Sequence, residues 1–250
     1  MLKEFTKEYF LTAGQCNPEL EMPLSLLMTR IIDIATLHAN SWGVGYAKLI
    51  EDNQAWVLSR VTIEMKRYPR VNETYSVTTW IEDYNRHFSL RNMEIKGEDG
   101  STLGYARTIW LVINLATRES VDMSKLSYIR ENVLGRECPI TPQGRLRLQQ
   151  VTRSVNHTFG YVECDLNRHV NTVRYLELLL NQFPLETYDA LMVHRMEIAF
   201  TKETRYGETV TVNIDDSDPH NCVLSIDDVE GVSHCRGRLV FAPRQQQEIK

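Results

Sequence analysis

The chain has 250 residues, of which 42% are hydrophobic and 24% are charged, an ordinary composition for a soluble globular protein. A formal net charge of −5 and the lack of any Lys/Arg run argue against nucleic-acid binding. No apolar run reaches the roughly 18 residues of a membrane span, and the N-terminus has no signal-peptide core. These features predict a cytoplasmic protein with no membrane span.

The cysteines are odd in number and form no Cys-x-x-Cys pair, which disfavours both disulfide and zinc frameworks. They are Cys16, Cys138, Cys164, Cys222 and Cys235. Cys164 adjoins the polar motif discussed below, so a nucleophilic role is weighed for it. The simpler interpretation is a small buried apolar side chain.

The first half of the chain is predicted to form a strand, a long helix and then four strands. Residues 3–12 alternate as a strand, and residues 23–40 carry apolar side chains at helical spacing, with Gly43 as the terminator. Asp99-Gly100 is a hairpin signal. The strand patterns that follow the helix are residues 55–65, 74–82, 87–96 and 102–114. Because helices and strands do not alternate, the order predicts one helix wrapped by a curved antiparallel sheet.

The second half repeats this order after a stretch of weak periodicity. Pro139, Pro142 and Gly144 indicate a linker at residues 136–150. The pattern then restarts with a strand at residues 153–161 and a helix that Pro184 stops. Further strands are expected at residues 194–202, 209–215, 221–229 and 233–241. The predicted domains are residues 1–135 and 151–250, joined by residues 136–150.

Residue identities also repeat between the two halves. Arg60-Val-Thr-Ile63 matches Arg195-Met-Glu-Ile198 at an offset of 135 residues (195 − 60), and Glu73-Thr74 matches Glu208-Thr209 at the same offset. The repeated order and the constant offset indicate an internal duplication of a domain of about half the chain.

The two copies differ where the chain enters the helix. The second copy carries four polar side chains there: Asp165, Asn167, His169 and Asn171. The corresponding residues 17–23 include no histidine, and Glu203 falls opposite Tyr68. We therefore expect the second half to perform chemistry and the first half to shape a binding cavity.

The polar motif lies at the start of the second helix, where free N–H groups and the helix dipole can polarise a carbonyl oxygen. His169 and Asn167 can orient a water molecule or donate to a carbonyl, and Asn171 is placed as the N-cap. Equally, the motif can be a capped helix with a solvated polar edge. No Gly-x-Ser-x-Gly elbow supports a serine triad.

A metal site is disfavoured. Counted from Asp165 as an EF-hand loop, the sixth and twelfth positions hold Val170 and Leu176, where calcium loops need Gly and Glu. No further ligands occur at useful spacing, and no metal or other cofactor is implied.

The segment Asn167-Arg-His169-Val-Asn171-Thr-Val-Arg-Tyr175 resembles the Asn-x-His-Val-Asn-Asn-x-x-Tyr signature of fatty acyl–acyl carrier protein thioesterases, and Asp165 also matches that motif. The segment Phe200-Thr-Lys-Glu203-Thr204-Arg205 is similar, more weakly, to the family's aromatic-Arg-Arg-Glu-Cys segment. The resemblance covers nearly the full chain and implies an α+β fold of two tandem hotdog domains.

What the resemblance implies is hydrolysis of a thioester. Glu203, expected on a strand, would activate water as the general base. Asn167 and His169 would orient the water and bind the carbonyl, and Asp165 would hold the arrangement. The family's cysteine after the glutamate is Thr204 here, which argues against a covalent Cys–His mechanism.

The implied partner is an acyl carrier protein bearing a fatty acyl chain, and the absence of the plant enzymes' targeting extension suggests a bacterial relative. Trp42, Trp56 and Asn171 are candidate substrate contacts. Because carrier proteins are acidic, a basic docking patch is expected. Two sets are candidates: Lys66, Arg67 and Arg70, or Arg145, Arg147 and Arg153.

Other functions stay open from the sequence. One alternative is an acyl-CoA thioesterase on the same fold, and another is a non-catalytic fatty-acyl binding protein in which the motif only caps a helix. Acyl-chain length and oligomeric state are not determined by the sequence, and a homodimer is one option.

Overall fold

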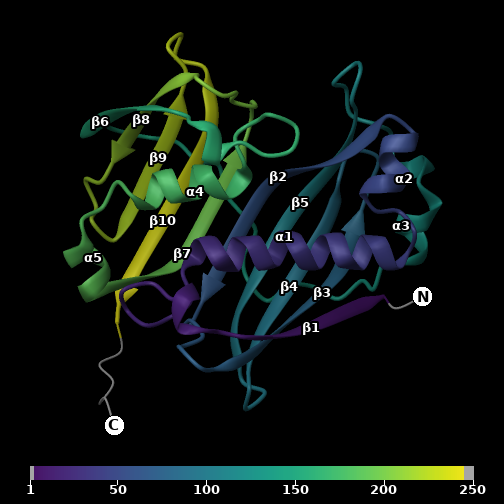
Figure 1. Cartoon of the computed structure of the whole chain (residues 1–250), viewed down its shortest axis with the longest axis horizontal. Helices are drawn as coiled ribbons and strands as arrows, with labels where there is room; N and C mark the ends of the chain where they lie inside the picture. The colour runs from purple at the N-terminus through teal and green to yellow at the C-terminus, as the bar shows by residue number, and fades with distance from the viewer. Residues whose placement is uncertain (1–2, 245–250) are drawn as a thin grey trace. The chain divides into compact units, whose positions relative to one another are not determined.

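The computed structural model describes residues 3–244, apart from the side chains of residues 127 and 128. The chain divides into two compact units, Met1–Gln143 and Gly144–Lys250, called here the first and the second unit. Each is a hotdog domain with a helix against an antiparallel sheet (Figure 1). No helix in the described residues is long and apolar enough to cross a membrane.

The sheet of the first unit has five strands in the order β1-β3-β4-β5-β2, all antiparallel. The strands are β1 (Glu4–Phe10), β2 (Gln54–Met65), β3 (Thr74–Tyr84), β4 (Ser89–Gly97) and β5 (Thr102–Asn114). The helices are α1 (Leu24–Ser41) and the short α2 (Tyr46–Glu51) and α3 (Ser127–Glu131), with single turns η1 (Ala13–Gln15) and η2 (Met123–Lys125). The hairpin predicted at Asp99-Gly100 joins β4 to β5, with Gly100 at φ +77°.

Helix α1 forms because its apolar side chains recur on one face, and it packs that face against β1 and β3 (Figure 1). Leu27, Met28 and Ile31 are completely buried. The helix ends at Ser41 with Trp42 as its C-cap, and Gly43 follows at a φ of +75°, the left-handed conformation that glycine adopts without strain. The predicted helix and its terminator are thus confirmed.

The second unit has the same strand order in its own numbering, β6-β8-β9-β10-β7, again antiparallel. The strands are β6 (Arg153–Thr158), β7 (Leu191–Phe200), β8 (Thr209–Asp215), β9 (Asn221–Asp227) and β10 (Ser233–Pro243). The helical elements are η3 (Tyr161–Glu163), α4 (Thr172–Leu180) and α5 (Leu185–Ala190). Helix α4 lies close to β10 because Gly237 has no side chain, and a Cβ there would stand 2.5 Å from Leu179 Cδ1.

The segment predicted as a linker has contacts within both units. Arg136 O accepts a hydrogen bond from Trp80 Nε1, and Cys138 N donates to Glu82, both in the first unit. Further along, Gln149 and Gln150 donate their backbone N–H groups to the Asp215 carboxylate in the second unit.

Several predicted boundaries were wrong in the second unit. Helix α4 ends at Leu180 instead of reaching Pro184, and a separate helix, α5, follows that proline. Strand β7 runs from Leu191 to Phe200, whereas residues 194–202 were predicted. Glu203 therefore lies beyond the strand. The chain leaves the ladder because the N–H groups of Thr201 and Lys202 both turn to the carbonyl of His234.

Candidate active site

Residues 164–171 form a tight loop that the Asp165 carboxylate holds together. Its Oδ1 accepts the backbone N–H of Asn167 at 2.8 Å and that of His169 at 3.2 Å. The backbone closes the loop as well, because Asp165 N donates to His169 O at 2.8 Å. Such side-chain turns are a common use of aspartate and asparagine. Asp165 thus fixes the direction of the two residues that follow it.

The tip of the loop presents polar groups to solvent. Arg168 takes a left-handed φ of +64°, and Asn167 is exposed. In the part of the chain that is described, the Asn167 side chain makes no hydrogen bond. An amide so placed is able to donate to an oxygen of a bound molecule.

His169 and Glu203 meet across two segments of the second unit. His169 Nε2 lies 3.5 Å from Glu203 Oε2, with 20% and 44% of the two side chains exposed. A backbone bridge pairs His169 with Arg205, and Val170 N donates to Thr204 O at 2.8 Å. The backbones of the loop and of the segment after β7 are therefore joined next to this imidazole–carboxylate pair.

Asn171 caps helix α4 as predicted, because its Oδ1 accepts the N–H of Val173 at 2.9 Å. This bond occupies the side-chain oxygen. Trp42 and Trp56 lie in the first unit, where they pack against the buried cluster of Ile81, Val112, Met123 and Ile129.

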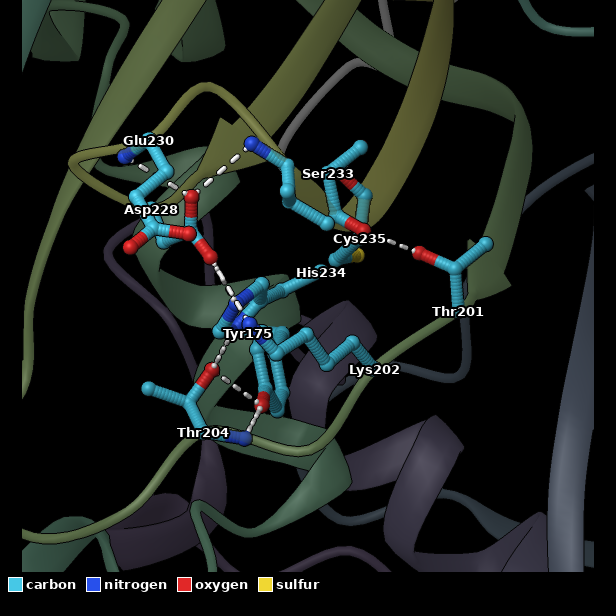
Figure 2. A network of polar contacts seen from close by, with 10 residues as sticks. Tyr175, Thr201, Lys202, Thr204, Asp228, Glu230, Ser233, His234 and Cys235 are labelled. Atoms are coloured by element: carbon cyan, nitrogen blue, oxygen red, sulfur yellow. Dashed lines mark hydrogen bonds and ion pairs between the residues drawn. The ribbon is translucent and has the colours of Figure 1, made fainter.

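A chain of hydrogen bonds that sequence reasoning missed includes Thr204, the residue after Glu203 (Figure 2). Tyr175 OH donates to Thr204 Oγ1 at 2.8 Å, and Thr204 Oγ1 lies 2.6 Å from His234 Nδ1. His234 Nε2 lies 3.2 Å from Asp228 Oδ2, which also accepts from Lys202 Nζ at 2.8 Å. Thr204 and His234 are completely buried.

The bond directions in this chain follow from its two ends, Asp228 and Tyr175. Hydrogen bonds from Lys202, from the N–H of Val232 and from His234 hold the pKa of Asp228 far below its ordinary value, so the carboxylate only accepts. His234 Nε2 therefore donates to Asp228. Thr204 Oγ1 accepts from Tyr175, so its own proton points at Nδ1 of His234.

The connectivity resembles a hydroxyl–imidazole–carboxylate triad, but the Thr204 hydroxyl cannot attack a substrate. Thr204 Oγ1 is buried and is already engaged by Tyr175, whose own oxygen accepts the Thr204 N–H at 3.0 Å. Burial raises the pKa of Tyr175 to about 12, so its phenol keeps the proton that it donates. Thr204 is a structural group here, which leaves Glu203 as the exposed base candidate.

Of these residues, Tyr175 had a sequence signal because it belongs to the motif quoted above. His234 and Asp228 had none, since they lie beyond the motif and no spacing connects them with it. Cys164 is partly buried, and its Sγ lies 3.6 Å from Gly160 O. No group of three His, Cys, Asp or Glu side chains among the described residues is arranged to hold a metal.

Comparison with known proteins agrees with this architecture. The acyl-ACP thioesterase N-terminal domain matches residues 2–128, and the acyl-ACP thioesterase C-terminal domain matches residues 147–243. Together these matches cover most of the chain, which therefore belongs to the acyl-ACP thioesterase family.

Solved structures and curated relatives support the assignment. An acyl-ACP thioesterase from Bacteroides thetaiotaomicron is 30% identical with a TM-score of 0.87, covering 96% of this chain and 98% of that one. The 12:0-ACP thioesterase of Umbellularia californica shares the fold at 16% identity and a TM-score of 0.85, with 97% and 98% covered. A chloroplastic palmitoyl-acyl carrier protein thioesterase of Gossypium hirsutum is 22% identical over 96% of this chain. The chain spans 64% of that relative's length.

Proposed function

We propose that the protein hydrolyses the thioester of a fatty acyl–acyl carrier protein and releases a free fatty acid. The observation that carries this proposal is the His169–Glu203 pair, 3.5 Å apart, which brings the motif loop and the segment after β7 together in a chain of this family. We also propose a cytoplasmic location, which fractionation of producing cells tests.

In the proposed mechanism Glu203 takes a proton from water, and the water oxygen attacks the thioester carbonyl carbon. Asn167 and His169 donate to the carbonyl oxygen as negative charge develops on it. The C–S bond then breaks, the proton on Glu203 passes to the leaving thiolate, and the products are the fatty acid and the thiol. Asp165 supports the loop that presents both donors.

In this proposal the second unit performs catalysis and the first unit binds the acyl chain. The second unit carries Asp165, Asn167, His169 and Glu203, with Asn171 at the head of α4 as a substrate contact. The first unit, which contains the predicted domain of residues 1–135 and the buried helix α1, receives the acyl chain. Trp42 and Trp56 are the proposed contacts there, because both are large, partly buried side chains of that unit.

The carrier protein is proposed to dock around the motif loop. Four apolar side chains on η3, the loop and the segment after β7 are exposed, and they are Tyr161, Val162, Leu166 and Tyr206. Arg168 and Arg205 are exposed beside them, and neither forms an ion pair within residues 3–244. Apolar contact area flanked by arginine suits an acidic protein partner.

Each of the two basic patches that the sequence suggested for docking contains an arginine that is already engaged in an ion pair. Arg67 pairs with Glu73 at 2.8 Å, and Arg153 pairs with Asp216 at 3.0 Å. Arg145 and Arg147 are exposed and serve as comparison residues in the experiments below.

The test offers purified protein matched concentrations of acyl–acyl carrier protein and acyl-CoA and follows release of free thiol. We expect turnover with the carrier-protein ester. Faster turnover of the CoA ester would identify acyl-CoA as the substrate in place of the acyl–acyl carrier protein. No turnover of either ester would indicate a non-catalytic fatty-acyl binding protein.

A further inference from the structure

His234 holds the chain on both sides of Glu203. Its backbone carbonyl accepts the N–H groups of Thr201 at 2.9 Å and Lys202 at 3.2 Å, and its ring accepts the Thr204 hydroxyl at 2.6 Å. Glu203 is the single residue between these attachments, and it lies outside any strand. Figure 2 shows the contacts of His234 with Thr204 and Asp228.

The first unit is an internal control for this arrangement. Its Lys66 N–H donates to Leu103 O at 2.8 Å, as Thr201 N–H does to His234 O, so Leu103 is the counterpart of His234. The counterparts of Tyr175 and Thr204 are Leu27 and Pro69. The same backbone path therefore forms with apolar side chains, and the fold alone does not require the polar chain.

We propose that His234, oriented by Asp228, is a positioning residue that keeps the Glu203 carboxylate in place beside His169. The proposal rests on the proposed function of Glu203 as general base. A buried polar chain is costly unless every member is satisfied, and this one is satisfied throughout. Within residues 3–244, it occurs only in the unit that carries the imidazole–carboxylate pair.

The experiment compares two substitutions at position 234 by kcat, KM and thermal midpoint on acyl–acyl carrier protein. His234→Leu copies the residue of the first unit, and we expect it to fold and to lose roughly 10- to 100-fold in kcat at unchanged KM, since small displacements of a reacting group cost that much. His234→Asn keeps an oxygen near the place of Nδ1 for Thr204 but loses Asp228, so a smaller loss is expected.

A matched pair at Thr204 covers the case in which His234→Leu does not fold. Thr204→Ser keeps the hydroxyl and should retain kcat, whereas Thr204→Val removes it and should lose activity as His234→Leu does. Ser225→Ala is the control, because it deletes another buried hydroxyl of the second unit, one that bonds to Asp227. We expect it to leave both kcat and KM unchanged.

The positioning role predicts a loss of kcat at unchanged KM in both His234→Leu and Thr204→Val, with kcat retained in Thr204→Ser. Full kcat in folded His234→Leu or Thr204→Val would overturn the positioning role while wild-type turnover upheld the proposed function. Absence of turnover in the wild-type protein would instead defeat the proposed function itself.

Discussion

The loops that enter α1 and α4 have the same backbone geometry but different side chains. In the first unit Asn17 N donates to Glu21 O at 2.9 Å and Asn17 Oδ1 accepts Glu21 N at 3.0 Å; in the second unit Asp165 and His169 make the same bonds at 2.8 Å and 3.2 Å. Leu20 takes a left-handed φ of +60°, close to the +64° at its counterpart in the second unit.

The segments that follow β2 and β7 also match between the two units. Met22 N donates to Pro69 O at 2.8 Å, as Val170 N does to Thr204 O at 2.8 Å. Beside this shared contact the first unit has Tyr68, which is 5% exposed, where the second unit has the half-exposed Glu203. The comparison teaches that the loop is a property of the fold, and that a few side chains on it separate the two units.

The largest effect is expected from removing the carboxylate that the first unit lacks. Glu203→Ala should lower kcat on acyl–acyl carrier protein by roughly 10²- to 10⁴-fold, the usual contribution of a general base, with little change in thermal midpoint because the side chain is half exposed. Steady-state kinetics and a melting curve measure both. Retention of more than a tenth of the wild-type kcat would place the base elsewhere.

The sequence predicted the fold well where the pattern is local. The two antiparallel sheets, the helix that Gly43 ends and the Asp99-Gly100 hairpin all follow from periodicity and turn chemistry. The end of β7 did not, because it depends on the carbonyl of His234, more than thirty residues away in the sequence. Non-local hydrogen bonds leave no trace in strand periodicity.

The candidate site likewise has a local part that the sequence predicted and a non-local part that it did not. The motif loop and the N-cap at Asn171 were visible because their residues lie within one helix entry. The Thr204–His234–Asp228 chain was not, since a lone histidine and a lone aspartate in β-rich sequence carry no spacing signal. The distance between His169 and Glu203 likewise required the three-dimensional structure.

The docking surface offers a second way to distinguish the units, because Arg168 has Leu20 as its counterpart in the first unit. Reversing charge in the double variant Arg168→Glu/Arg205→Glu should lower kcat/KM for acyl–acyl carrier protein about tenfold, mainly through KM, since rim charges steer association. Activity on a short acyl-pantetheine thioester should stay the same.

The control for docking is Arg145→Glu/Arg147→Glu, which changes the same total charge at exposed positions of the second unit. We expect it to leave kcat/KM within twofold. A larger loss in this control than in the Arg168/Arg205 variant would move the docking surface to Arg145 and Arg147.

A smaller effect is expected at Asp165, where the first unit shows that asparagine makes the same turn. Asp165→Asn should keep most of kcat, whereas Asp165→Ala loses the side-chain bonds to two backbone N–H groups, each worth about 1 kcal/mol, and should lower both kcat and the thermal midpoint. If Asp165→Asn is as inactive as Asp165→Ala, the carboxylate charge itself takes part in the reaction.

The smallest effect is expected at Cys164, although it stands next to the motif. Its counterpart Cys16 makes the same contact, with Sγ 3.4 Å from Thr12 O where Cys164 Sγ lies 3.6 Å from Gly160 O. A feature that both units share follows the fold and not the chemistry, so Cys164→Ala should keep kcat within about twofold. Trapping of an acyl group on Cys164, detected by mass spectrometry of the quenched reaction, would contradict this and revive a covalent route.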